Sequence, residues 1–308
     1  MREPVILRLI GSAARAWWDD DCTRLGASLA YYTLFAIAPV LLVATAIAGM
    51  VFGAAAVRGE IVGQLDHLLG REGALAVQSL LEGASHRRAG ILATVIGGIT
   101  FIVAATGAFL ELQVALNTIW RVKPRPSGHL RAFVIDRLRS FGLVVAIGFL
   151  LLVSLSVTAA LAALNAWLFA VSPSRPSLWT AASTLVSLVV TTGLFALLFR
   201  FLPDVRLRWR DVTTGAGVTA VLFTLGQQVI GFYFGQSEIA TTYGATGSMM
   251  VLLLWVYYSC QILLFGAEFT RVYVQSRGPK PMPEEFAVKD PHAVNPKSAL
   301  APVSKSET

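Results

Sequence analysis

Six long stretches without a charged residue constrain this 308-residue chain more than any other feature of its sequence. A helix of about 20 apolar residues crosses the hydrocarbon core of a bilayer, which is roughly 30 Å thick. Charged residues make up only 14% of the chain and hydrophobic residues 55%, so a soluble fold would lack polar residues to cover its surface. The sequence therefore predicts an all-α integral membrane bundle with six transmembrane helices. We expect them within Leu25–Val57, Ala89–Leu110, Ser140–Ser174, Pro176–Phe199, Val212–Ser237 and Ile239–Ala267.

Positively charged residues are distributed unevenly between the connections of these expected helices. Of the 25 Lys and Arg residues, 20 lie in the N-terminal segment, the second and fourth connections and the C-terminal segment. Because cytoplasmic loops carry an excess of Lys and Arg, this distribution places both termini in the cytoplasm. The net charge of +7 follows from these loops and does not require a nucleic-acid partner.

Two segments flank the membrane domain, which we expect over residues 25–274. Within residues 1–24, an apolar stripe at helical spacing predicts an amphipathic helix that lies on the cytoplasmic face of the membrane. The stripe consists of Ile6, Leu9, Ile10, Ala13, Ala14 and Trp17. Residues 275–308 contain many prolines among charged and small residues, so we expect a disordered cytoplasmic tail.

Three consecutive acidic residues, Asp19, Asp20 and Asp21, precede the first apolar stretch. Successive positions of a helix differ by about 100°, so these side chains point in three directions and cannot converge on one metal ion without partners. The four histidines are scattered, and no Cys or His cluster has metal-ligand spacing. We interpret the aspartates as a polar entry to the first span, with a carboxylate paired for structural reasons as the alternative. No catalytic residue, metal or cofactor is predicted.

Polar side chains inside the expected spans are costly, so they mark either functional sites or hydrogen bonds between helices. On the sixth span, Tyr257, Gln261 and Glu268 share one stripe that runs from mid-membrane to the cytoplasmic rim. Glu111 closes the second span at the same level. Glu268 and Glu111 could share a cation, for which the candidates are Arg137, Arg139 and Arg271, and the alternative is an interfacial carboxylate in contact with water.

Three further polar residues complete a hypothetical substrate path. Asn117 follows Glu111, Gln227 lies near the middle of the fifth span, and Tyr31 lies on the first span. Ordinary packing between helices is the alternative for each of them. The predicted path residues are Tyr31, Glu111, Asn117, Gln227, Tyr257, Gln261 and Glu268.

Several separated motifs resemble one known family. They are Ser28–Phe35 followed by Pro39, Glu111–Trp120, Leu202–Val205, Tyr243–Ser248, Leu252–Ser259 and Gly266–Glu268. In this order they resemble the YihY/BrkB family of six-span bacterial inner-membrane proteins, over about residues 16–274. The resemblance implies a multi-pass protein of the bacterial inner membrane. Family members have carried the label ribonuclease BN, and transport of lipids or other solutes has been suspected for them.

These observations favour a transporter-like or lipid-handling function related to the cell envelope. The expected partners are membrane lipids, including anionic lipids or lipid-linked precursors. A membrane scaffold for envelope proteins, which transports nothing, is the alternative. A ribonuclease is the least favoured function, because the sequence lacks a His-rich metal motif and a soluble catalytic domain, and we expect no enzyme.

Overall fold

The computed structural model describes residues 5–52, 78, 91–124, 176–236, 245–277, 282–283 and 287–289, and most of these residues are helical. The helices are α1 (Val5–Asp19), α2 (Cys22–Phe52), α4 (Ile91–Trp120), α6 (Pro176–Phe201), α7 (Trp209–Gln236) and α9 (Ala245–Arg277). The strands are β1 (Val122–Pro124), β2 (Val205–Arg206), β3 (Met282–Pro283) and β4 (Ala287–Lys289).

The described parts of five of the six apolar stretches lie in long helices, and the stretch Ser140–Ser174 lies outside the described residues. By length and composition, two described segments can cross a membrane, namely Thr184–Phe201 of α6 and Met249–Arg277 of α9. Helices α4 and α9 continue beyond the predicted ends of their apolar stretches. The stretches end at the carboxylates Glu111 and Glu268, but both carboxylates have partners in the fold, so the helices need not stop there.

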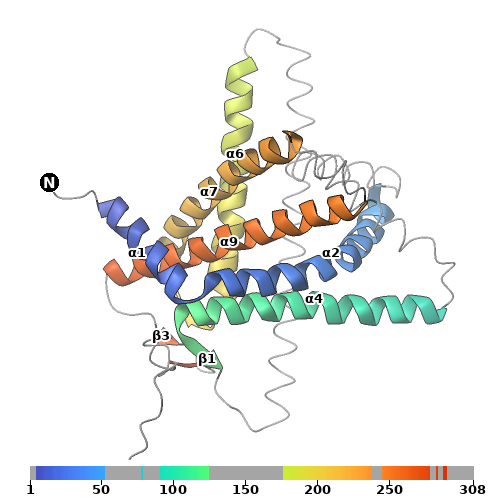
Figure 1. The fold of residues 1–308 in the computed structure, drawn as a ribbon, viewed down its shortest axis with the longest axis horizontal. Coiled ribbons are helices and arrows are strands. Elements are labelled where there is room, and N and C mark those ends of the chain that lie inside the picture. Colours follow the sequence, from blue (N-terminus) through green and yellow to red (C-terminus); the bar gives the residue numbers. More distant parts are fainter. Residues whose placement is uncertain are drawn as a thin grey trace, which may run out of the picture.

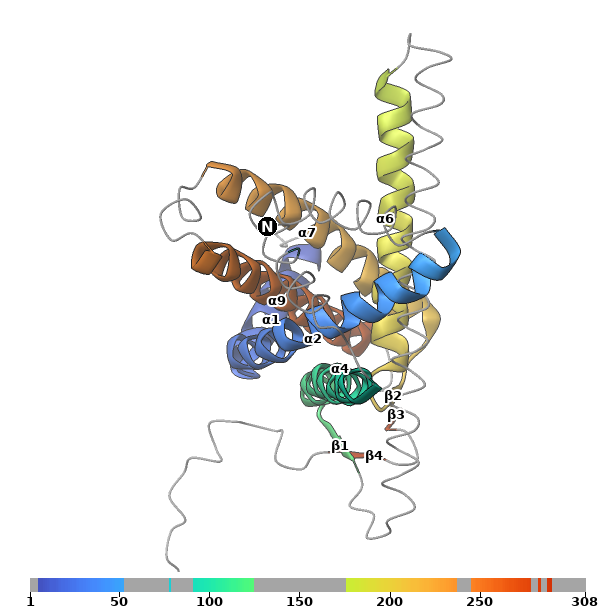
Figure 2. The same cartoon turned by 90° about the vertical axis from the view of Figure 1, so that its right-hand side faces the viewer.

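Helix α9 is the central helix of the described fold, because it packs against α1, α2, α4 and α7 (Figure 1). Helices α2 and α4 run side by side along one flank of α9. Helix α6 packs on α7 and runs across the direction of α4 and α9 (Figures 1 and 2). If α6 and α9 both cross the membrane, one of them is therefore strongly tilted.

The long helices expose large apolar side chains on their outer faces. Exposed residues occur on α2, α6, α7 and α9, including Phe35 (60% exposed), Val189 (63%) and Val229 (65%). A soluble protein rarely leaves apolar surface of this extent in water. A surrounding bilayer accounts for it, because lipid tails solvate such side chains without cost.

The amphipathic helix expected within residues 1–24 is present as α1, but its apolar stripe is used mainly against protein. Ala13 is fully buried and packs with Phe269 and Tyr273 of α9, and Leu9 lies against the same cluster. Ile10, which also belongs to the predicted stripe, is 40% exposed. Since α1 docks on α9, burial within the protein, rather than contact with lipid alone, explains the stripe.

The segment expected to be a disordered tail contributes to the fold in its first part. Strand β3 pairs with β2, and β4 pairs with β1, in both cases antiparallel. Ala287 is buried in the core next to these pairs. Short strands of this kind depend on their partners, so composition rich in proline does not reveal them.

Helices α7 and α9 approach each other closely along a seam of small residues. Thr270 of α9 lies against Gly215 of α7, and Thr219 of α7 lies against Gly266 of α9. Each threonine hydroxyl donates a hydrogen bond to the glycine carbonyl of its own helix, at 2.7 Å for Thr270 and 2.8 Å for Thr219. Small residues at this spacing let two helices pack with their backbones close together, as in membrane bundles.

We predict that Gly215→Ala destabilises the protein, because an added Cβ would overlap the Thr270 side chain. Overpacking of this kind costs about 1–3 kcal/mol. Gly217→Ala on the same helix is the matched control, since its Cβ would meet only Thr192 Cγ2 at 4.0 Å. Thermal unfolding in detergent should show a lower midpoint for Gly215→Ala and an equal or higher midpoint for Gly217→Ala. Equal midpoints for the two variants would contradict the seam.

Candidate functional site

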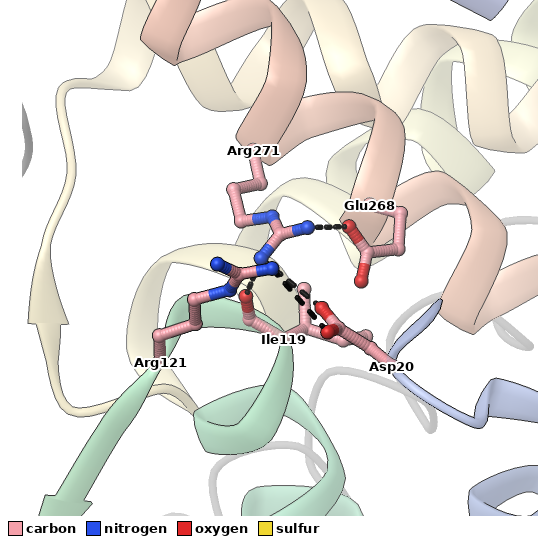
Figure 3. A network of polar contacts seen from close by, with 5 residues as sticks. All are labelled: Asp20, Ile119, Arg121, Glu268 and Arg271. Atoms are coloured by element: carbon pink, nitrogen blue, oxygen red, sulfur yellow. Dashed lines mark hydrogen bonds and ion pairs between the residues drawn. The ribbon is translucent and has the colours of Figure 1, made fainter. Parts of the chain in front are cut away.

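Arg271 on α9 lies at the centre of a buried cluster of charged side chains (Figure 3). Its Nη2 lies 2.7 Å from Oε2 of Glu268, one turn earlier on the same helix. Its Nη1 lies 3.1 Å from Oδ2 of Asp20 and donates a 2.8 Å hydrogen bond to the carbonyl oxygen of Ile119. One guanidinium therefore joins α9, the turn between α1 and α2, and the last turn of α4.

A second arginine approaches the same aspartate from the end of α4. Nη2 of Arg121 lies 3.5 Å from Oδ1 of Asp20, so the carboxylate of Asp20 lies between two guanidinium groups. The Arg121 side chain is 38% exposed, whereas that of Asp20 is 7% exposed. The cluster is thus closed on the Arg271 side and reaches solvent on the Arg121 side.

Left-handed backbone conformations place both of these residues. Asp21 has φ 51° and turns the chain between α1 and α2, so that Asp20 faces inward. Arg121 has φ 56° and follows the last residue of α4, where its N–H donates a 3.0 Å hydrogen bond to the carbonyl of Thr118. Glycine is the usual residue at such a helix end. With arginine at this position, the side chain reaches the carboxylate of Asp20.

The four charged residues of this cluster balance one another. Asp20 and Glu268 are acidic, Arg121 and Arg271 are basic, and the Glu268 side chain is fully buried. Burial of a charge is tolerated only with close partners of opposite sign, and loss of one partner leaves the other uncompensated. Nε of Arg271 and Nε of Arg121 are buried donors without a hydrogen-bond partner among the described residues, so the pairing within the cluster is incomplete.

A second polar contact joins α4 to the connection between α6 and α7. Asn117 Nδ2 donates to Oδ2 of Asp204 at 2.8 Å, and the Asp204 backbone N–H donates to Oδ1 of Asn117 at 2.9 Å. Gln113 Nε2 lies 3.3 Å from the other carboxylate oxygen of Asp204. This reciprocal arrangement fixes the start of the connection on the end of α4.

Two further polar contacts lie between α2 and its neighbours. The hydroxyl of Ser28 donates a hydrogen bond to the Glu111 carboxylate, which joins α2 to α4. Gln261 Nε2 on α9 lies 3.3 Å from the carbonyl oxygen of Cys22 and 3.4 Å from that of Thr23, at the start of α2. The Gln261 oxygen has no hydrogen-bond partner among the described residues. Polar groups therefore line the contacts of α2 with both α4 and α9.

The structure brings together some of the residues predicted to line a path and separates others. Glu268 belongs to the charged cluster, and Glu111, Asn117 and Gln261 each bond to a neighbouring helix or connection, as described above. The remaining three are Tyr31, which is 58% exposed on α2, and Gln227 and Tyr257, which are partly buried on α7 and α9. These three make no hydrogen bond among the described residues.

Among the described residues, the expected cation is found for one of the two glutamates. Glu268 pairs with Arg271, which was among the candidates, whereas Glu111 bonds to Ser28. Arg137 and Arg139 lie outside the described residues. A serine hydroxyl satisfies Glu111 because the close approach of α2 to α4 places that hydroxyl directly opposite the carboxylate.

Only the middle aspartate of the three enters the site. Asp19 and Asp21 are exposed, and Asp20 is the structural carboxylate that the sequence left as an alternative. No group of three His, Cys, Asp or Glu side chains in the described part of the chain is placed to hold a metal ion. The sequence did not assign roles to Arg121 or Asp204, although Asp204 lies within one of the family-like motifs.

Cys22 begins α2 directly beside the charged cluster and is fully buried. Burial raises the pKa of its thiol well above the ordinary range, and the carboxylates of Glu268 and Asp20 raise this pKa further. Because the thiolate is the reactive form of cysteine, the Cys22 thiol is unreactive while the fold is closed.

We predict that Asp20→Asn destabilises the protein by about 3 kcal/mol, because it leaves the buried Arg271 guanidinium without its interhelical counter-charge. Asp19→Asn and Asp21→Asn are matched controls, since both side chains are exposed and asparagine tolerates the left-handed backbone at position 21. Each control should change the free energy of unfolding by less than about 0.5 kcal/mol. Unfolding by denaturant in detergent measures all three, and three equal effects would refute the assignment.

We also predict slow alkylation of Cys22 in the folded protein. In a Cys260→Ala background, N-ethylmaleimide at pH 7 should label Cys22 only as fast as the cluster opens, because the buried thiol is protonated. Adding denaturant, or introducing Asp20→Asn, should accelerate the labelling. Mass spectrometry measures the rate of labelling. Rapid labelling of Cys22 in the folded protein without Asp20→Asn would show that the cluster is open to solvent.

Comparisons with known proteins agree with the helical, apolar character of the chain. A UPF0761 membrane protein of Ralstonia nicotianae is 29% identical over 266 residues, which cover 86% of this chain and 58% of that protein. A UPF0761 membrane protein of Methylibium petroleiphilum is 30% identical over 266 residues, which cover 81% of this chain and 58% of that protein. A UPF0761 membrane protein of Alcanivorax borkumensis is 27% identical over 267 residues, which cover 84% of this chain and 59% of that protein. The chain thus spans somewhat under two thirds of the length of these relatives.

No solved structure matches the chain. The model of one protein family, described as virulence factor BrkB, matches residues 13–289, which include the charged cluster, the Asn117–Asp204 contact and every described long helix. This match and the relatives named as membrane proteins confirm the resemblance inferred from the sequence motifs. The chain is therefore a membrane protein and belongs to the virulence factor BrkB family.

Proposed function

We propose that this protein spans the bacterial inner membrane six times, with both termini in the cytoplasm, and that it moves lipids or handles them within the membrane. The distribution of Lys and Arg supports the orientation. The apolar side chains exposed on α2, α6, α7 and α9 support contact with lipid over most of the helical surface. The names of the relatives describe membrane proteins and nothing further.

The observation that carries the proposal is the line of polar groups between α2, α4 and α9. The Ser28–Glu111 bond, the Gln261 side chain and the Glu268–Arg271 pair follow one another along the contacts of these three helices. Oε1 of Gln261 is a buried acceptor without a hydrogen-bond partner among the described residues. Unsatisfied polar atoms at membrane depth are expensive, so their presence favours a path for a polar group over a purely structural contact.

The substrate class that fits this line is a lipid with a polar head group, including anionic lipids and lipid-linked precursors. The head group would follow the polar contacts while the acyl chains stay against the exposed apolar faces of the helices. Basic cytoplasmic segments would raise the local concentration of anionic lipids at the membrane surface. The proposal includes no catalytic step, metal or cofactor.

We predict that Glu268→Gln slows lipid movement by roughly tenfold or more, because hydrogen bonds to charged groups are worth about 1.5–3 kcal/mol. The full chain is reconstituted in liposomes that contain a fluorescent phospholipid, and loss of fluorescence after addition of a membrane-impermeant reductant measures transbilayer movement. Asp19→Asn, which neutralises an exposed carboxylate, is the control and should retain the wild-type rate.

The midpoint of thermal unfolding in detergent provides a separate check that Glu268→Gln is folded. A folded variant with a wild-type rate would remove Glu268 from the path. Wild-type liposomes that move no lipid beyond protein-free liposomes would contradict lipid movement and favour the scaffold that transports nothing.

A further inference from the structure

The connection between α6 and α7 presents a group of exposed arginines beside two exposed aromatic rings. Arg206, Arg208 and Arg210 are all exposed, Phe201 is 52% exposed and Trp209 is 47% exposed. The group lies where α6 ends at Phe201 and α7 begins at Trp209. We refer to these five residues as the arginine patch.

Alternation of the side chains directs the arginines outward. Val205 and Leu207 are buried at 3% and 4% exposure, so Arg206 and Arg208, which alternate with them, point to the opposite side. Strand pairing of β2 with β3 holds the same segment in place. Since Asp204 is also bonded to Asn117, the positions of the arginines are fixed by the fold before any ligand arrives.

None of the three exposed arginines has an ion-pair partner among the described residues. Two acidic residues lie nearby in the sequence, Asp204 and Asp211. Asp204 is occupied by the amide groups of Asn117 and Gln113, and Asp211 lies in the first turn of α7. The connection therefore carries an excess of positive charge, and guanidinium groups match the geometry of phosphate oxygens.

The two aromatic rings of the patch lie together at the junction of α6 and α7. The Arg200 guanidinium lies 5.3 Å from the centre of the Trp209 ring, and the Phe201 and Trp209 rings meet edge to face at 5.9 Å. These rings adjoin the end of Thr184–Phe201, a segment apolar enough to cross a membrane. Tryptophan beside arginine at the end of a span is typical of the boundary between head groups and acyl chains.

We propose that the arginine patch binds the phosphate of an anionic phospholipid head group, with the aromatic rings against the upper part of its acyl chains. This inference rests on the proposed membrane orientation and deepens the lipid-handling function by assigning a recognition site outside the polar line. A nucleic acid or an acidic protein is the alternative ligand for the arginines. Exposed Phe201 and Trp209 next to an apolar span favour the lipid.

The test measures lipid retention by the full chain in detergent micelles supplied with equal amounts of phosphatidylglycerol and phosphatidylcholine. Native mass spectrometry counts the lipids that stay bound as their concentration is raised. The variant is Arg206→Gln/Arg208→Gln/Arg210→Gln. The matched control is Arg8→Gln/Arg15→Gln/Arg24→Gln, which removes the same charge from exposed positions on α1 and the start of α2.

Wild type and the control should retain phosphatidylglycerol in preference to phosphatidylcholine, whereas the patch variant should lose roughly fivefold in affinity per arginine, or about 100-fold in total. Excess inorganic phosphate should not displace the lipid, because it cannot use the aromatic rings. An equal loss of phosphatidylglycerol affinity in both triple variants would show that the effect depends on net charge alone. That result would overturn the site. Full displacement by phosphate would overturn the assignment to lipid.

Glu268→Gln separates this inference from the proposed function. That variant should retain phosphatidylglycerol at the wild-type level, because Glu268 is not part of the arginine patch, while its lipid movement slows. If no variant affects lipid movement but the patch variant alone loses phosphatidylglycerol, the site stands and the transport proposal fails. If the patch variant keeps phosphatidylglycerol, the site fails whatever the rate of lipid movement.

Discussion

The arrangement of the described helices depends on the contacts of one buried group, the guanidinium of Arg271. A charge at this depth persists only if groups of opposite charge and hydrogen-bond acceptors are held close to it in fixed positions. Its partners are Asp20, Glu268 and the carbonyl oxygen of Ile119, which come from three separate parts of the chain. The α1–α2 turn, the end of α4 and the last turns of α9 are consequently positioned together.

Helix α9 is held by different forces on its two sides. Towards α1, α2 and α4 it presents charged and polar side chains, and towards α7 it presents the small residues Gly266 and Thr270. Charge pairs fix the rotation and the height of the helix, because they require particular atoms to meet. The small-residue seam fixes the distance between the backbones. These constraints leave α9 little freedom to slide against its neighbours without breaking the cluster.

The helices were predictable from the sequence because apolar stretches of this length form helices irrespective of their neighbours, and Glu268 was predictable because a carboxylate in such a stretch needs a partner. The hydrogen-bond and ion-pair partners of the charged residues were harder to predict from the sequence. Ile119 and Arg271 are 152 residues apart, and nothing local indicates that they meet. Of the three adjacent aspartates only Asp20 faces the cluster, and the left-handed turn at Asp21 decides this. Strands β3 and β4 depend on tertiary partners in the same way.

The last turns of α4 connect the charged cluster to the arginine patch. The carbonyl of Ile119 accepts a hydrogen bond from Arg271, and the side chain of Asn117, two residues earlier, holds Asp204 at the start of the segment that presents Arg206. Under the proposed function, this places the recognition of a head group and the entrance to the polar line on one shared anchor. The end of α4 therefore positions both sites, while each site binds through residues of its own.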